Sequence, residues 1–301
     1  METGPAGRLL RATTTDLPAP VAVAMASASP ELAGARPTTV LDGGIPWTAF
    51  EWGEPGASPV LLVHGITSSA NTFWRVGPAL AAAGRRVVAV DLPGHGRTGH
   101  WRGRYRLADT SADLAGFIRA SGLDQPNLAA IGHSWGARIV AGLPAAGIRP
   151  ERLILLDPPA LTLGAISEMT TDPLEQHYDS LASATTAVRA TNPPWSEGDI
   201  YAKALALTQF DPAAFFGVIL ENGDWDGGLK VLDDPAARQV PIWLIRGEFG
   251  AGGMVSDDFV VKFQRRIGAD HVVTIRDGPH SPQRTHPEAT VLAILRALDL
   301  A

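Results

Sequence analysis

The chain has 301 residues, a net charge of -6 and no cysteine, with 45% hydrophobic and 19% charged residues. This composition is typical of a globular protein and excludes a chain that is disordered throughout. Without cysteine there are no disulfides, thiolate nucleophiles or cysteine-held metal centres. The acidic balance disfavours a nucleic-acid partner, and no run approaches the roughly 18 apolar residues of a membrane span.

The N-terminal residues 1–37 contain no clear strand or amphipathic helix. Arg8 and Arg11 precede an alanine-rich apolar stretch, which raises secretion as an alternative, but Asp16, Pro18 and Pro20 disfavour a signal peptide. We therefore interpret residues 1–37 as a loosely ordered arm and expect a cytoplasmic protein.

The first predicted strands, 38–41 and 47–52, flank the turn sequence Asp42-Gly43-Gly44 and form an antiparallel edge. Continuous apolar runs then alternate with helical stretches, as in a parallel sheet covered on both faces. The runs are 59–63, 86–90, 127–131, 152–156, 241–245 and 272–275. The helices are 73–83, 107–120, 135–145, 257–266 and 287–298. The pattern predicts a doubly wound α/β fold with a mostly parallel sheet.

One connection is much longer than a crossover helix requires. About 80 residues separate the strand ending near Asp157 from the strand after Val240. We interpret residues 160–235 as a helical cap, inserted between core segments 38–159 and 236–301, that covers a pocket at the carboxyl ends of the strands. An unrelated surface insertion is the alternative.

The most informative motif is Gly132-His133-Ser134-Trp135-Gly136, which follows a predicted strand and opens a predicted helix. A very tight strand-to-helix turn strains the central residue and leaves no room for side chains two positions away, so glycine is needed there. The serine hydroxyl is then exposed at the strand tip, beside a helix N-terminus that favours negative charge. The motif predicts that Ser134 is a nucleophile.

With this motif, the chain from residue 38 to 299 resembles the α/β-hydrolase superfamily. The other landmarks are His64-Gly65, the turn Asp91-Leu92-Pro93-Gly94-His95-Gly96, and Gly278-Pro279-His280. The resemblance implies a Ser-His-acid triad, no cofactor, and hydrolysis of ester, amide, thioester, lactone or carbon–carbon bonds. It also implies an oxyanion hole made by the backbone N–H groups of Ile66 and Trp135.

A serine hydroxyl needs a base within hydrogen-bond reach, and histidine titrates near neutrality. His280 is the best candidate because it follows the final strand and comes after Ser134 in the chain. We interpret His286, beside Pro287, as a residue at the start of the last helix. His133 is expected to pack or hydrogen-bond locally.

The sequence leaves two candidates for the acid of the triad, because Gly250 occupies the position that the superfamily usually uses. Glu248 lies in the same loop and has a longer side chain. Asp157 ends the preceding strand, at a site that some superfamily members use. We favour Asp157 because a strand end is more rigid than the glycine-rich loop 250–253, and Glu248 is the alternative.

These residues predict a cofactor-free serine hydrolase, a carboxylesterase that cleaves small hydrophobic esters through an acyl-enzyme. One alternative is a hydrolase of carbon–carbon bonds in diketone-like ring-fission products. Another is a ligand receptor on the same fold with slow turnover. Serine at the centre of the Gly132–Gly136 motif disfavours the halide- and epoxide-processing chemistries, which need aspartate there. No metal, nucleoside-triphosphate or dinucleotide motif follows a predicted strand. The sequence does not predict an oligomeric state.

Overall fold

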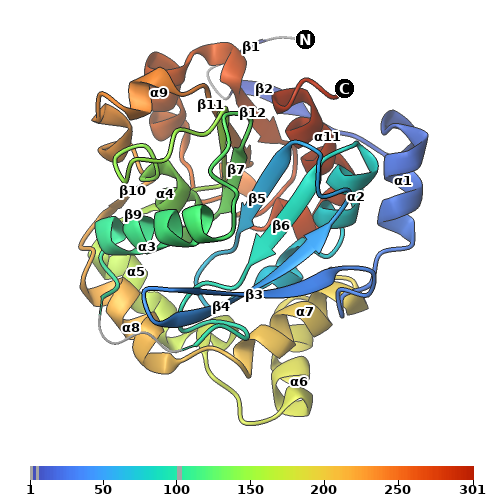
Figure 1. The fold of residues 1–301 in the computed structure, drawn as a ribbon. Coiled ribbons are helices and arrows are strands. Elements are labelled where there is room, and N and C mark those ends of the chain that lie inside the picture. The colour runs from blue at the N-terminus through green and yellow to red at the C-terminus, as the bar shows by residue number, and fades with distance from the viewer. Residues whose placement is uncertain (1–2, 5–6, 100–103) are drawn as a thin grey trace.

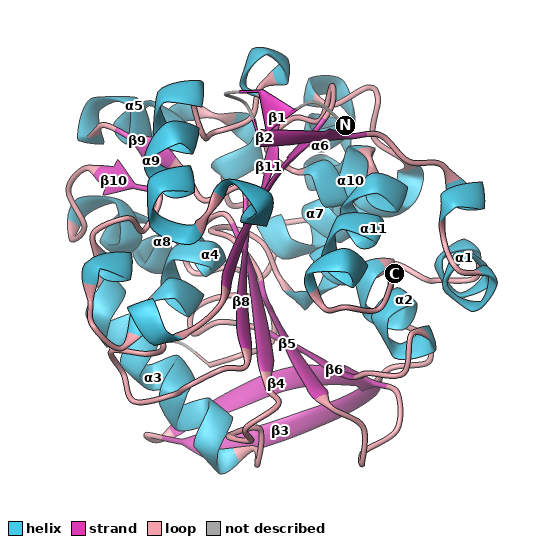
Figure 2. Cartoon of the chain, turned by 90° about the horizontal axis from the view of Figure 1, so that it is seen from above, coloured by secondary structure: helices cyan, strands magenta, loops and turns pink. Residues whose placement is uncertain are grey.

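The computed structural model describes residues 3–4, 7–99 and 104–301. In this part of the chain, ten strands form one twisted sheet with helices on both faces (Figures 1 and 2). The strands are β1 (Thr3–Gly4), β2 (Gly7–Leu10), β3 (Arg36–Asp42), β4 (Ile45–Trp52), β5 (Pro59–Val63), β6 (Arg86–Val90), β7 (Ala129–His133), β8 (Arg152–Leu156), β11 (Ile242–Gly247) and β12 (Val272–Ile275). Their order across the sheet is β1-β2-β12-β11-β8-β7-β5-β6-β4-β3.

The centre of the sheet is parallel and almost completely buried. Strands β12, β11, β8, β7, β5 and β6 pair in parallel, and every residue of β5 and β7 is buried. Strands β3 and β4 add the antiparallel edge at one side. The predicted fold class is therefore confirmed, and apolar runs mark the central strands because both faces of these strands pack against helices.

The helices form two layers around the sheet. They are α1 (Ala19–Ala26), α2 (Val76–Ala82), α3 (Leu107–Ala120), α4 (Trp135–Ala141), α9 (Asp257–Ile267), α10 (Pro282–Thr285) and α11 (Pro287–Ala297). Helices α3, α4 and α9 pack into one hydrophobic core, and α1, α2 and α11 into the other, on opposite faces of the sheet (Figure 2). The first residue of α4 directly follows Ser134, which places the predicted nucleophile at a helix N-terminus.

The N-terminal segment differs from the loosely ordered arm expected for residues 1–37. Strand β2 pairs in parallel with β12, and α1 packs against α2, with Val21 and Met25 buried. Pro18 and Pro20 lie at the start of α1, where a helix tolerates proline because the first amides have no intrahelical acceptor. The expectation failed because a strand of four residues carries too little periodic signal to be recognised.

Residues 160–235 contain four α-helices and a small two-stranded antiparallel sheet, and they form a cluster at one end of the main sheet (Figure 1). The helices are α5 (Leu163–Glu168), α6 (Leu181–Thr191), α7 (Glu197–Leu207) and α8 (Pro212–Leu220), and the small sheet pairs β9 (Ala160–Leu161) with β10 (Trp225–Asp226). Phe210, Phe215 and Trp225 are buried in the core shared with α3 and α4. The segment therefore packs against the sheet domain and shares its hydrophobic core.

No single helix in the described ranges has both the length and the apolar composition needed to cross a membrane. Helices α7 and α8 meet that test only together, and a bend of 88° separates them.

Candidate active site

Ser134 occupies a strained turn between β7 and α4, with φ 55° and ψ -121°. A Cβ added to Gly132 would lie 2.2 Å from the carbonyl oxygen of Gly136, and one added to Gly136 would lie 2.4 Å from that of His64. Both obstacles are backbone atoms, which cannot move without displacing a strand or helix. The two glycines of the motif are therefore required by close packing, as the sequence pattern predicts.

Three side chains form a continuous chain of hydrogen bonds at the strand ends. Ser134 Oγ lies 2.9 Å from His280 Nε2, and His280 Nδ1 lies 2.7 Å from Asp157 Oδ2. Because a carboxylate only accepts hydrogen bonds, Nδ1 carries the proton and Nε2 is left to accept the serine hydroxyl. Asp157 is fully buried, whereas a quarter of the His280 side chain is exposed. This is the arrangement of a nucleophile, a base and the group that orients the base.

Asp157 is held from several sides at the end of β8. Its backbone has φ 44°, and its N–H donates to the carbonyl of Ile245 on β11 at 2.8 Å. Its carboxylate accepts hydrogen bonds from the N–H groups of Gly247 at 3.0 Å and Met254 at 2.9 Å. These contacts fix the carboxylate beside His280 Nδ1.

Glu248, the alternative acid, lies elsewhere. Its Oε2 accepts a hydrogen bond from the N–H of Asp277 at 2.7 Å, which ties the loop after β11 to the turn after β12. Of the two candidates, the structure brings Asp157, and not Glu248, against His280.

The loop that carries His280 is held by neighbouring backbone and by a second histidine. The N–H of His280 donates to the carbonyl of Gly252 at 3.1 Å, and His133 Nε2 donates to the carbonyl of His280 at 3.0 Å. Burial, followed by the nearby His280, lowers the pKa of His133 well below its usual value. His133 is thus a neutral positioning group beneath the loop.

His64 links the loops after β5 and β6. Its Nδ1 donates to the carbonyl of Gly65 at 2.7 Å, and its Nε2 accepts the N–H of Leu92 at 3.0 Å. Burial lowers the pKa of His64 to about 3 and that of the neighbouring His95 to about 4. Both rings are therefore neutral parts of the scaffold near pH 7.

A cavity of about 230 Å³ includes Ser134 and His280 in its wall. Its apolar lining comes from both the sheet domain and the segment 160–235, through Ile66, Met169, Leu174, Trp195, Met254 and Pro279. Gly65 and Ile66 bring the loop after β5 to the cavity, and a Cβ on Gly65 would lie 2.8 Å from Ser134 Cβ. The segment 160–235 therefore supplies part of the wall of the pocket that holds the serine.

The Trp135 side chain does not take part in this wall. It is buried, its ring lies 5.2 Å from that of Trp225 on β10, and the Arg138 guanidinium lies over both rings at 5.2 and 4.9 Å. Only the backbone N–H of Trp135, at the first position of α4, remains for a role at the nucleophile.

A cluster of polar side chains in the cavity was not predicted from the sequence. Lys203 Nζ on α7 donates to Thr67 Oγ1 at 2.9 Å and to the Thr67 carbonyl at 3.1 Å, and Glu175 is hydrogen-bonded to the same hydroxyl. Burial lowers the pKa of Lys203 to about 8 and raises that of Glu175. Thr67 has a φ of 49° and directly follows Ile66. In the sequence of α7, Lys203 interrupts the apolar second half of the helix, and this interruption was the available signal for a buried polar contact.

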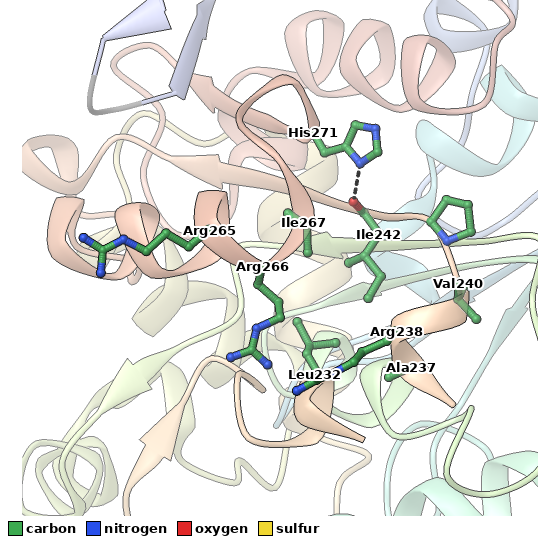
Figure 3. Close-up of a pocket in the computed structure, with 10 residues that line it drawn as sticks. Leu232, Ala237, Arg238, Val240, Ile242, Arg265, Arg266, Ile267 and His271 are labelled. Atoms are coloured by element: carbon green, nitrogen blue, oxygen red, sulfur yellow. Dashed lines mark hydrogen bonds between the residues drawn. The ribbon is translucent and has the colours of Figure 1, made fainter. Parts of the chain in front are cut away.

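A larger cavity of about 540 Å³ lies near the start of β11, and Figure 3 shows its lining residues. Arg238, Arg265 and Arg266 contribute to its wall, and His271 Nδ1 donates to the carbonyl of Ile242 at 3.1 Å. Its described lining contains no hydroxyl or carboxylate side chain, so it offers no nucleophile–base–acid set.

A family model described as "alpha/beta hydrolase fold" matches residues 58–216, which is more than half of the chain. The chain belongs to the α/β-hydrolase family. Among solved structures, that of E-2-(acetamidomethylene)succinate hydrolase superposes on this α/β-hydrolase with a TM-score of 0.73. The match covers 88% of this chain and 99% of the other at 23% identity, which shows a shared fold.

Curated relatives match over different lengths. Esterase Rv0045c of Mycobacterium tuberculosis is 27% identical over 278 residues, covering 84% of this α/β-hydrolase and 86% of the relative. A dihydrolipoyllysine-residue acetyltransferase component of an acetoin cleaving system, from Pseudomonas putida, is 36% identical over 123 residues. That match covers 41% of this chain, and the chain spans about a third (32%) of the length of that relative.

Proposed function

We propose that this α/β-hydrolase is a serine hydrolase, a carboxylesterase that cleaves small esters through an acyl-enzyme. The observation that carries the proposal is the hydrogen-bond chain from Ser134 through His280 to Asp157 in the wall of a cavity. Such a chain activates a hydroxyl that is otherwise a poor nucleophile.

In the proposed reaction, Ser134 Oγ attacks the ester carbonyl while its proton passes to His280 Nε2. Asp157 stabilises the imidazolium that results and keeps Nδ1 protonated. The backbone N–H groups of Ile66 and Trp135 stabilise the negative oxygen of the tetrahedral intermediate. His280 then protonates the departing alkoxide, and a water molecule, deprotonated by the same histidine, releases the acid.

Two observations support an ester as the substrate. The esterase of Mycobacterium tuberculosis is similar to this chain over most of both lengths. The cavity volume of about 230 Å³ suits a small substrate, and its apolar side chains suit a short carbon chain next to the scissile carbonyl.

The proposal is tested with a fluorophosphonate probe and with ester turnover. We expect one probe molecule to attach per chain, at Ser134, with release of fluoride, and we expect steady turnover of 4-nitrophenyl butyrate. Ser134→Ala should abolish both, whereas Ser121→Ala, a serine outside the cavity, should retain both. Labelling that survives Ser134→Ala would show that another residue is the nucleophile.

The same assay separates ester from carbon–carbon bond hydrolysis. A vinylogous diketone acid of the ring-fission type is compared with 4-nitrophenyl butyrate at equal concentrations. A higher kcat/KM for the diketone would overturn the esterase proposal, and a single turnover followed by arrest on every ester would indicate a receptor.

A further inference from the structure

Arg284 is a buried cation in the wall of the cavity. It lies on α10, four residues after His280, and only 6% of its surface is exposed. Its guanidinium carbon lies 4.6 Å from the centre of the Trp195 ring. Stacking on an indole fixes the plane of a guanidinium and leaves the N–H groups at its edge free to bind a partner.

The hydrogen bonds of Arg284 within the protein are few and weak for a buried charge. Nη2 donates to Thr72 Oγ1 at 3.1 Å, Nη1 reaches the carbonyl oxygen of Asp199 at 3.4 Å, and Nε has no partner. Burial lowers the pKa of Arg284 to about 10, so the group is still charged at neutral pH. Both acceptors are uncharged groups.

The nearest carboxylates are already engaged by other groups. Asp199 accepts hydrogen bonds from Arg75 at 2.8 Å and from Trp74 at 3.0 Å. Glu175 faces Lys203 at 3.8 Å. Asp172, also in the cavity wall, accepts the N–H of Leu174 at the start of a helical turn.

Within the described residues, Arg284 forms no ion pair within 4.0 Å, and the negative charges of Asp199 and Glu175 act on it only from farther away. A buried charge without a directly paired counterion costs several kcal/mol, and a folded protein tolerates this where a ligand completes the pair.

We propose that Arg284 binds a carboxylate of the substrate, so that the preferred esters are those that carry a free carboxylate besides the scissile bond. This inference rests on the proposed function, because it assigns a substrate class to the same cavity. Guanidinium and carboxylate match in shape and charge, and removal from water strengthens their hydrogen bonds. The apolar wall would contact the carbon chain between the two functional groups.

The test compares two esters of nearly the same size and shape, one with a charged end group and one with a neutral end group. Monoethyl glutarate is paired with ethyl 4-carbamoylbutanoate, in which a neutral carboxamide replaces the carboxylate, and the pair is repeated with the succinate and adipate homologues. For at least one chain length we expect kcat/KM of the wild type to be at least about tenfold higher for the carboxylate, a typical value for a charge-assisted hydrogen bond.

Variants locate the preference at Arg284. Arg284→Gln should bring the ratio of the two kcat/KM values to about one, with a smaller change for the neutral ester, and Arg284→Lys should keep part of the ratio because it keeps the charge. Arg265→Gln, which removes an exposed charge at the distant cavity, should leave the ratio unchanged. An equal loss on both esters in Arg284→Gln would indicate a purely structural role and overturn the proposal.

A binding measurement keeps this inference separate from the proposed reaction. In Ser134→Ala, isothermal titration calorimetry should show tighter binding of monoethyl glutarate, or of a homologue, than of the matching carboxamide, by about tenfold. Equal affinities at all three chain lengths would overturn the carboxylate site even if esters are hydrolysed. If no ester is hydrolysed, the proposed function fails, and these affinities still decide whether the carboxylate site exists.

A second variant serves if Arg284→Gln does not fold. Arg284→Lys in the Ser134→Ala background allows the same comparison of affinities, and an undiminished preference for the carboxylate there would overturn the proposal.

Discussion

Asp157 Oδ2 lies 2.7 Å from His280 Nδ1, although 123 residues separate them in the chain. The same carboxylate accepts the N–H groups of Gly247 and Met254. Three donors therefore converge on one carboxylate. An asparagine at this position has only one acceptor oxygen and would point an amide N–H at one of these donors.

We predict that Asp157→Asn lowers kcat by about 10⁴, because the histidine loses the partner that fixes its tautomer. Glu248→Gln, a matched change in the neighbouring loop, should change kcat by less than about threefold, since its side chain contacts the N–H of Asp277 instead. Both values are measured as initial rates on 4-nitrophenyl butyrate, with circular dichroism to show that each variant is folded. A larger loss in Glu248→Gln would assign the acid to the other loop.

The contact of Lys203 with Thr67 ties the segment 160–235 to the loop of Ile66, so its loss should affect catalysis as well as stability. We predict that Lys203→Met lowers kcat by about tenfold, because the proposed oxyanion donor is less firmly placed. It should also lower the free energy of unfolding by about 3 kcal/mol, because it leaves Glu175 buried without a counterion.

The double variant Lys203→Met/Glu175→Gln separates the two effects. Stability measured by urea denaturation should return most of the way to wild type, whereas kcat should stay low. Full recovery of kcat in the double variant, which lacks both the ion pair and the Thr67 contact, would show that the unpaired charge of Glu175, and not the lost Thr67 contact, slows the reaction in Lys203→Met.

The close backbone contacts of Gly136 lead to a further prediction. A Cβ at Gly136 would lie 2.4 Å from carbonyl oxygens of both Val63 and His64, so Gly136→Ala should destabilise the fold by about 3 kcal/mol or more. Gly56→Ala is the matched control, because no atom lies within 4 Å of the added Cβ, and it should change stability by less than about 0.5 kcal/mol. Similar unfolding midpoints for the two variants would contradict the steric explanation.

We predict that two buried histidines, His64 and His95, make the protein less stable in mild acid. The folded-state pKa values of His64 and His95 are about 3 and about 4, against 6.5 in an unfolded chain. Between these limits the unfolded chain binds protons that the folded chain does not. The contribution of these two histidines to stability is therefore complete above about pH 6.5, and it is lost as the pH drops, by about 1.4 kcal/mol per pH unit for each histidine.

The measurement is the free energy of unfolding in urea at a series of pH values from about 7.5 to about 5. His95→Gln should remove the contribution of one proton from the slope, since glutamine does not titrate. A slope that is the same in the variant and the wild type would contradict the assignment of His95 as a neutral buried group.

The sequence alone determined much of the sheet, because the central strands are buried on both faces and so appear as continuous apolar runs. The predicted runs 59–63, 86–90, 152–156 and 272–275 coincide with β5, β6, β8 and β12. The glycines around Ser134 were equally readable, because the steric limits of a tight turn act within five residues. Strand β2 and helix α1 were missed, since each depends on partners, β12 and α2, that lie far along the chain.

The tertiary structure decided what depends on distance between remote segments. The sequence left Asp157 and Glu248 as alternatives, because both follow strands whose carboxyl ends meet at one edge. Only the orientation of each side chain, set by the donors around it, shows which one faces His280. In the same way Lys203 and Arg284 are unremarkable charged residues in the sequence. They come to share a cavity with Ser134 because α7 and α10 pack over the strand ends, and that packing is fixed by contacts across the whole fold rather than by local periodicity.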